Sequence, residues 1–162
     1  MDAAPYATSP RVCAKTGLAL PPGAGYVGVL VEDGLRIVRR DVALGAWDGE
    51  PPANAIAHWR GVVPKRGKPA KPVMDEAILF DCFDRLAGAI EPAKQNFRYV
   101  VALLLLRKKK LKFEDSRRSD GVDVLFVRDT RTGKRAEVID PQLTEADMDD
   151  VQAEVFQVLG WE

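Results

Sequence analysis

The fold of the first half of the chain is decided by residues 26–39, Tyr-Val-Gly-Val-Leu-Val-Glu-Asp-Gly-Leu-Arg-Ile-Val-Arg. Two runs rich in β-formers flank the pair Asp33-Gly34, and this arrangement is among the strongest short-range signals of a β-hairpin. Downstream, Asp41 is predicted to cap a brief helix ending near Trp47, because its carboxylate can accept the free first-turn N–H groups. After a stretch rich in Pro, Gly and Asn, residues 56–63 predict a short strand.

The best boundary in the chain is the basic, proline-punctuated segment 64–72, Pro-Lys-Arg-Gly-Lys-Pro-Ala-Lys-Pro. It has no apolar periodicity, so it predicts a linker. The expected organisation is a tail over 1–12, a β-rich module over 13–63, the linker, and an α+β helical domain over 73–162.

The second half predicts three helices and a short antiparallel sheet. Apolar residues recur at helical spacing over 74–89, and Pro92 suits the first turn of a second, more apolar helix that runs to about Lys110. Strands are predicted over 111–114, 122–128 and 134–139, and Thr144 offers an N-cap for a final helix. The predicted fold class is therefore α+β.

Composition indicates a globular protein and an expected cellular compartment. Hydrophobic residues make up 46% and charged residues 30%, with 24 basic and 24 acidic side chains, as in a globular protein without net basicity. The only cysteines are Cys13 and Cys82, which disfavours a disulfide framework and favours a reducing compartment. The start shows no signal-peptide pattern, and the longest apolar run, 100–106, is too short to span a bilayer. The expected location is cytoplasmic, with no membrane partner.

The order of a turn-rich Cys knuckle, a β-hairpin and a short helix, over residues 13–47, resembles a treble-clef zinc finger. The knuckle residues are Cys13, Thr16 and Gly17, and the helix start is placed at Arg40 and Asp41. The pattern Cys-x-x-Thr-Gly…Arg-Arg-Asp…Trp also resembles bacterial proteins without an assigned activity, which implies no activity. In the alternative interpretation, Cys13 is a small buried apolar side chain and Gly17 a turn glycine with positive φ.

The resemblance implies a degenerate finger, because the thiolates of the family pattern are missing. Thr16 occupies the second knuckle position, and Val42 and Gly45 occupy the positions expected for the other pair. A structural zinc site needs four soft or imidazole ligands. No metal and no other cofactor is therefore expected.

Few residues offer catalytic chemistry. His58 is the only histidine, and the sequence has neither a Gly-x-Ser-x-Gly elbow nor a phosphate-binding loop. His58 is predicted to be a strand residue, and Cys82, on the apolar face of a helix, an inert core thiol. An enzyme acting through His58 is the third hypothesis.

Charge is the more informative feature. Residues 107–118 contain seven basic side chains and only two acidic ones. The basic residues are Arg107, Lys108, Lys109, Lys110, Lys112, Arg117 and Arg118. Such a cluster could neutralise nucleic-acid phosphates. From Gln142 onward the chain holds six acids and no cation, so the final helix could instead dock beside the cluster and neutralise it.

The leading hypothesis is a non-enzymatic adaptor or assembly module that binds another protein through the finger-like module or the linker. The alternative is an RNA- or DNA-associated factor using the basic cluster at 107–118. The sequence does not indicate the oligomeric state.

Overall fold

The computed structural model describes residues 6–7, 11–65 and 76–159. Along the chain its elements are β1 (Tyr6–Ala7), β2 (Gly25–Asp33), β3 (Arg36–Ala43), the 3-10 helix η1 (Leu44–Ala46), β4 (Ala55–Val62), α1 (Glu76–Arg85), α2 (Pro92–Arg107), β5 (Leu111–Ser119), β6 (Val122–Asp129), β7 (Arg135–Asp140) and α3 (Glu145–Leu159). Two sheets and three α-helices confirm the predicted α+β class. Most of the predicted tail and linker lies outside the described residues.

The N-terminal sheet has the strand order β1-β3-β2-β4. Its centre is the predicted hairpin, in which β2 and β3 pair antiparallel around Asp33 and Gly34. Gly34 has a φ of 61°, which glycine adopts without a steric penalty. The strand predicted over 56–63 is present as β4, antiparallel to β2. The two-residue β1 pairs parallel to β3.

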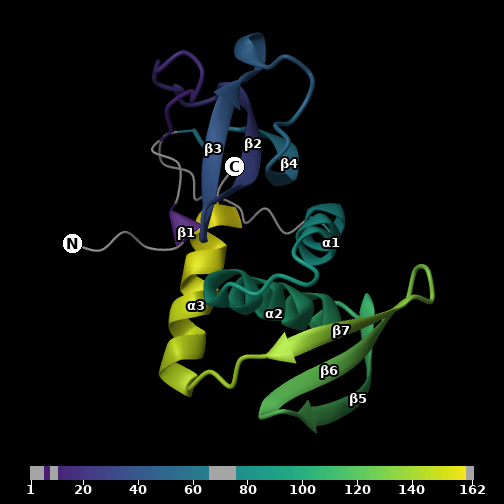
Figure 1. Cartoon of the computed structure of the whole chain (residues 1–162). Helices are drawn as coiled ribbons and strands as arrows, with labels where there is room; N and C mark the ends of the chain where they lie inside the picture. Colours follow the sequence, from purple (N-terminus) through teal and green to yellow (C-terminus); the bar gives the residue numbers. More distant parts are fainter. Residues whose placement is uncertain (1–5, 8–10, 66–75, 160–162) are drawn as a thin grey trace.

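One continuous apolar core joins the helices to both sheets. It contains Leu30 and Trp59 from the N-terminal sheet, Phe97 from α2, and Val127 and Val138 from the C-terminal sheet. Figure 1 shows α2 between the two sheets, with α1 and α3 beside it. None of the described helices has the length and apolarity that crossing a membrane requires. The division into units at 13–63 and 73–162 remains a prediction, for which the shared core suggests a direct test.

The C-terminal sheet has the order β5-β6-β7 and is antiparallel throughout. β5 extends to Ser119, beyond the predicted end at residue 114, because it pairs with β6 along almost its whole length. The turn between them has positive φ at both Asp120 and Gly121, as in the type I′ turn that is common in two-residue hairpin loops. Thr144 caps α3 as predicted, since its hydroxyl accepts a hydrogen bond from the Asp147 N–H at 3.1 Å.

The predicted treble-clef helix is wrong. Arg40 and Asp41 do not begin a helix but lie inside β3, and only the three-residue η1 follows at Leu44–Ala46. Asp41 is fully buried and pairs across the sheet with Gly28, so its carboxylate caps no helix. The knuckle segment instead forms a parallel bridge between Cys13 and Asp41 beside the sheet. Strand pairing with β2 on one side and with the knuckle on the other keeps this segment extended.

A buried polar cluster takes the place of the expected finger. Arg39 is 2% exposed, and its guanidinium donates hydrogen bonds to the Asp41 carboxylate at 3.1 Å and to the Tyr26 hydroxyl at 3.0 Å. It also donates to the carbonyl of Val158 in the last turn of α3 at 2.9 Å. Cations complement the negative end of a helix dipole, so Arg39 fastens the end of α3 to the sheet.

Candidate interaction surface

The predicted basic cluster extends from the end of α2 along β5 instead of forming one patch. Neighbouring residues of a strand point to opposite faces, so Arg117 and Arg118 lie on different sides of the sheet. Arg117 forms an ion pair with Asp115 at 3.2 Å, and Arg118 approaches Asp123 at 3.9 Å. Anion binding by these residues remains a prediction.

The remaining cations of the cluster lie at the junction of α2 and β5. Lys110 pairs with Glu76 of α1 at 3.6 Å. Arg107 ends α2, Lys108 follows as its C-cap, and Lys109 has a φ of 60°. Cations at this position complement the helix dipole. The local structure therefore gives several of them a role without a partner molecule.

Where the structure describes both, the acidic final helix lies apart from the basic cluster. In Figure 1, α3 lies across α2 from β5 and β6. Of the ion pairs found among the described residues, none joins α3 to residues 107–118. The helix instead packs Val151, Val155, Val158 and Leu159 into the core. The acids of α3 and the cations of β5 therefore act as separate surfaces.

Phe126 lies at the centre of a sheet face that points away from the core. Its neighbours Leu125 and Val127 pack toward the helices, so strand alternation places Phe126 on the opposite face. The guanidinium carbons of Arg117 and Arg135 lie 5.4 Å and 4.5 Å from the centroid of its ring. Arginine favours such contacts with aromatic faces. We call this side of β5, β6 and β7 the open face.

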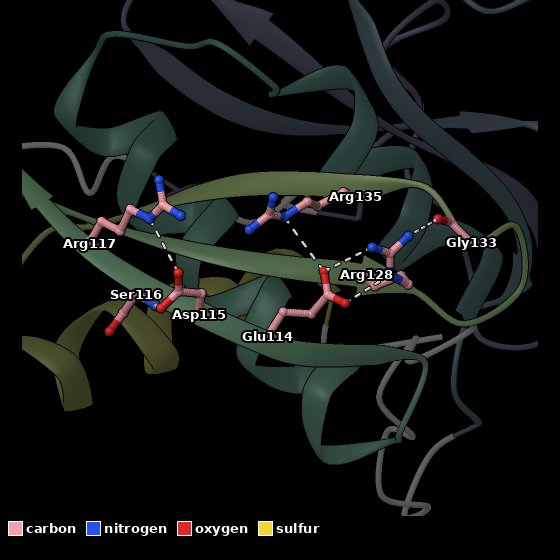
Figure 2. Close-up of polar contacts among 7 residues, drawn as sticks. All are labelled: Glu114, Asp115, Ser116, Arg117, Arg128, Gly133 and Arg135. Atoms are coloured by element: carbon pink, nitrogen blue, oxygen red, sulfur yellow. Dashed lines mark hydrogen bonds and ion pairs between the residues drawn. The ribbon is translucent and has the colours of Figure 1, made fainter.

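Carboxylates fix the arginines of the open face in place. Glu114 pairs with Arg128 at 2.9 Å and with Arg135 at 3.5 Å, and Figure 2 shows it between them, with Asp115 beside Arg117. Hydrogen bonding from Arg128 is the main cause that lowers the pKa of the Glu114 carboxyl, and it also raises the pKa of Arg128. A β-bulge at Glu114 places its side chain where it reaches both arginines. The open face therefore carries a network of ion pairs around the ring of Phe126.

The open face combines an aromatic ring with arginines. Aromatic and arginine side chains are enriched among the residues that dominate the energy of protein interfaces. Side chains that are already held in one geometry lose less entropy when a partner binds.

His58 lies elsewhere, on β4, where its ring stacks on Trp47 with centroids 6.1 Å apart. It is exposed, and no described carboxylate, hydroxyl or thiol forms a hydrogen bond with it. Within the described part of the chain there is also no group of three His, Cys, Asp or Glu side chains that could hold a metal ion. The structure thus shows no orienting group for a His58-based mechanism.

The Cys13 knuckle forms a local thiol environment. Cys13 is 1% exposed, its sulfur accepts a hydrogen bond from the Ala43 N–H at 3.3 Å, and Gly17 has a φ of 74°. Burial alone would raise the pKa of the Cys13 thiol, but hydrogen bonds from Thr16, Ala43 and Lys15 outweigh it and lower that pKa to about 7. Thr16 thus serves as a hydrogen-bond donor at the position where the finger pattern has a thiolate.

This environment gives a first prediction. In a Cys82→Ala variant, thiolate absorbance is expected to report titration of Cys13 near pH 7, because the knuckle donors favour the charged form. Adding Thr16→Val should move the midpoint upward, since the hydroxyl donor is lost. Lys15→Ala is the matched control, because it keeps the backbone donor and should leave the midpoint in place. A midpoint near the ordinary thiol value of about 8.5 would contradict the prediction.

No protein-family model matches the chain, and the searches of curated proteins and of solved structures found no match. The resemblance to a treble-clef finger and to a bacterial family therefore finds no support, and the structure of residues 36–46 contradicts the finger directly.

Sequence analysis missed the central residue of the open face. Phe126 belongs to an apolar run, Val-Leu-Phe-Val at 124–127, in which alternation between two faces is hidden because both faces carry apolar residues. The flanking strands held a usable signal. Their charged residues Glu114, Arg117 and Arg135 indicate that one face of the sheet, the face that carries Phe126, is exposed to solvent.

Proposed function

We propose that the chain is a protein-binding module and that the open face is its recognition surface. The observation that carries this proposal is the position of Phe126, centred on a solvent-facing sheet and flanked by the guanidinium groups of Arg117 and Arg135. Phe126 offers apolar contact area, and the arginines offer donors around it. The proposed recognition surface differs from the finger-like module and the linker that the sequence suggested for the adaptor role.

The mixture of charges favours a protein partner over nucleic acid. The cations of the open face stand beside three acids of the same face, Glu114, Asp115 and Glu137. Two of these acids already pair with its arginines. A uniformly anionic phosphate backbone is repelled by such carboxylates, whereas a protein can present an apolar group to Phe126, carboxylates to the arginines and cations to the acids. We expect a partner surface with an exposed apolar side chain and acidic neighbours.

The test is a quantitative capture with matched variants. Wild-type chain immobilised at equal density should retain a defined protein from lysate, and Phe126→Ala with Arg135→Ala should reduce that retention by about tenfold or more. Phe156→Ala is the control, because Phe156 is 38% exposed on α3, away from the open face. Equal retention by wild type and the open-face variant would overturn the proposal.

Nucleic acid is the second candidate, because an aromatic ring flanked by arginines on a sheet can also stack an unpaired base. A fluorescent single-stranded RNA of mixed sequence is the probe. This function predicts affinity that falls steeply with salt and weakens when Lys108, Lys109 and Lys110 are replaced by Ala. Binding that is absent or independent of salt would exclude it.

A further inference from the structure

Arg98 of α2 is a buried cation outside the surfaces described so far. It is 8% exposed. Its guanidinium makes a cation–π contact with Phe83, whose ring centroid lies 4.1 Å from the guanidinium carbon. Its Nε donates to the Phe83 carbonyl at 2.9 Å, and Nη1 donates to the Glu137 carbonyl at 2.6 Å. Backbone carbonyls of α1 and β7 therefore hold the guanidinium at a fixed place.

Within the described part of the chain, no carboxylate forms an ion pair with Arg98. None of the ion pairs among the described residues includes Arg98, and Asp84 acts on it only through space. Burial is the main cause that lowers the pKa of Arg98. The other buried arginine, Arg39, has the Asp41 carboxylate beside it. A buried charge without a counter-ion is unfavourable, so an anion bound beside the Arg98 guanidinium would be stabilised by it.

Arg98 lines a cavity of about 270 Å3. The other walls are mainly apolar and come from the α1–α2 connection, β6 and β7, with Leu86, Ile90, Val124 and Ile139 among them. Glu137 is the acidic residue of the lining, and its backbone carbonyl accepts the Arg98 hydrogen bond. Gln95 also lines the cavity, and its side-chain amide is held by the Ala89 carbonyl at 3.1 Å. Ile90 is 81% exposed, which leaves an apolar side chain at the rim.

We propose that this cavity binds a small apolar carboxylate, with the carboxylate on the Arg98 guanidinium and the apolar body against Leu86, Val124 and Ile139. A guanidinium offers five N–H donors, and the two carbonyls use only two of its nitrogens. Its planar fork matches the geometry of a carboxylate. The cavity adjoins the open face, because Glu137 belongs to both, but the proposed ligand does not depend on the protein-binding function.

The dimensions and charge of the cavity define the ligand class. A single cation fits a monoanion, and the apolar walls disfavour phosphate or sulfate, which need several donors. Since a cavity of about 150 Å3 accommodates benzene, this one has room for a six-membered ring or a short alkyl chain with its carboxylate. Benzoate and hexanoate are therefore suitable probes, and benzamide is the neutral match to benzoate.

The experiment is a titration of the full chain with benzoate, hexanoate and benzamide, followed by amide and Arg Nε–H chemical shifts. We expect saturable shifts around Gly88 and at Arg98, with benzoate binding about tenfold or more tightly than benzamide. An apolar carboxylate can also come from the C-terminus of a peptide, and an acetylated Val-Val dipeptide tests this source. Binding of the dipeptide without binding of benzoate would overturn the assignment to small acids.

Two variants keep the result interpretable. Arg98→Met should abolish the preference for benzoate over benzamide while keeping much of the buried volume. Because Arg98 also bonds two carbonyls, Ile90→Asp provides a second variant at an exposed position, and its like charge should weaken benzoate binding about fivefold. Leu35→Asp is its control, since Leu35 is 69% exposed in the β2–β3 turn. Equal affinity of benzoate and benzamide, or benzoate binding unchanged in both cavity variants, would overturn the proposal.

Discussion

Replacing Arg39 with alanine is expected to lower the free energy of unfolding by about 3–5 kcal/mol, because removal of one partner strands a buried charge. The Asp41 carboxylate would remain fully buried beside a lost cation, and the Val158 carbonyl would lose its donor. The guanidinium also lies 5.0 Å from the Trp59 ring centroid, so the packing of the indole should loosen. Urea denaturation followed by tryptophan fluorescence measures the change.

The neighbouring residue supplies the control. Arg40 is exposed on the other face of β3, and its closest carboxylate is Asp33 at 3.7 Å. Such a surface pair contributes about 0–1 kcal/mol, so Arg40→Ala should change the stability little. Similar losses in the two variants would show that the buried cluster does not have the energetic role assigned to it. The double variant Arg39→Met with Asp41→Leu should recover part of the loss, because it removes both charges together.

Replacing Phe97 with alanine is expected to cost about 3–5 kcal/mol, the usual range for a buried phenylalanine. Phe97 is 0% exposed on α2, and it belongs to the core that includes strands of both sheets. The cavity left behind would therefore weaken both halves together. The measurement is denaturant unfolding in a Trp161→Phe background, so that tryptophan fluorescence reports only Trp47 and Trp59 of the N-terminal half. A fluorophore on Ser116 of β5 reports the other sheet.

The same experiment tests the predicted division at 64–72. A shared core predicts one transition at the same denaturant concentration for both probes, shifted equally by Phe97→Ala. Independent units predict that the tryptophan signal keeps its midpoint while the β5 signal shifts. Phe113→Ala is the control, since Phe113 is 52% exposed and should cost much less.

The elements that sequence analysis predicted well are those with a strong local signal. Asp33-Gly34 between two β-rich runs, Pro92 at a helix start and Thr144 at an N-cap each act within a few residues. The error at Asp41 arose because a short carboxylate after a strand is a good N-cap, and nothing local shows that Arg39 will bury it. The partner that keeps Asp41 in the sheet is two residues away, and the third member of the contact, Val158, is 119 residues from Arg39.

The candidate surface was predicted less well than the fold. Counting charges along 107–118 identifies a basic segment, but β5 divides that segment between two faces and supplies carboxylates to its arginines. The end of β5 was also missed, although Asp120-Gly121 has the same dipeptide signal that located the first hairpin. Long-range pairing therefore decides which charges meet, and the linear order of residues does not contain it.

The contact between Arg39 and the end of α3 has a consequence for biosynthesis. Translation delivers the N-terminal strands first, and the carbonyl that receives Arg39 leaves the ribosome only 119 residues later. Until then Arg39 of the nascent sheet lacks the Val158 carbonyl that accepts its hydrogen bond. Contacts between residues so far apart in the sequence form slowly. We expect ribosome-bound chains that stop before α3 to be cleaved readily by protease in the β2–β3 region, and chains that include α3 to become resistant.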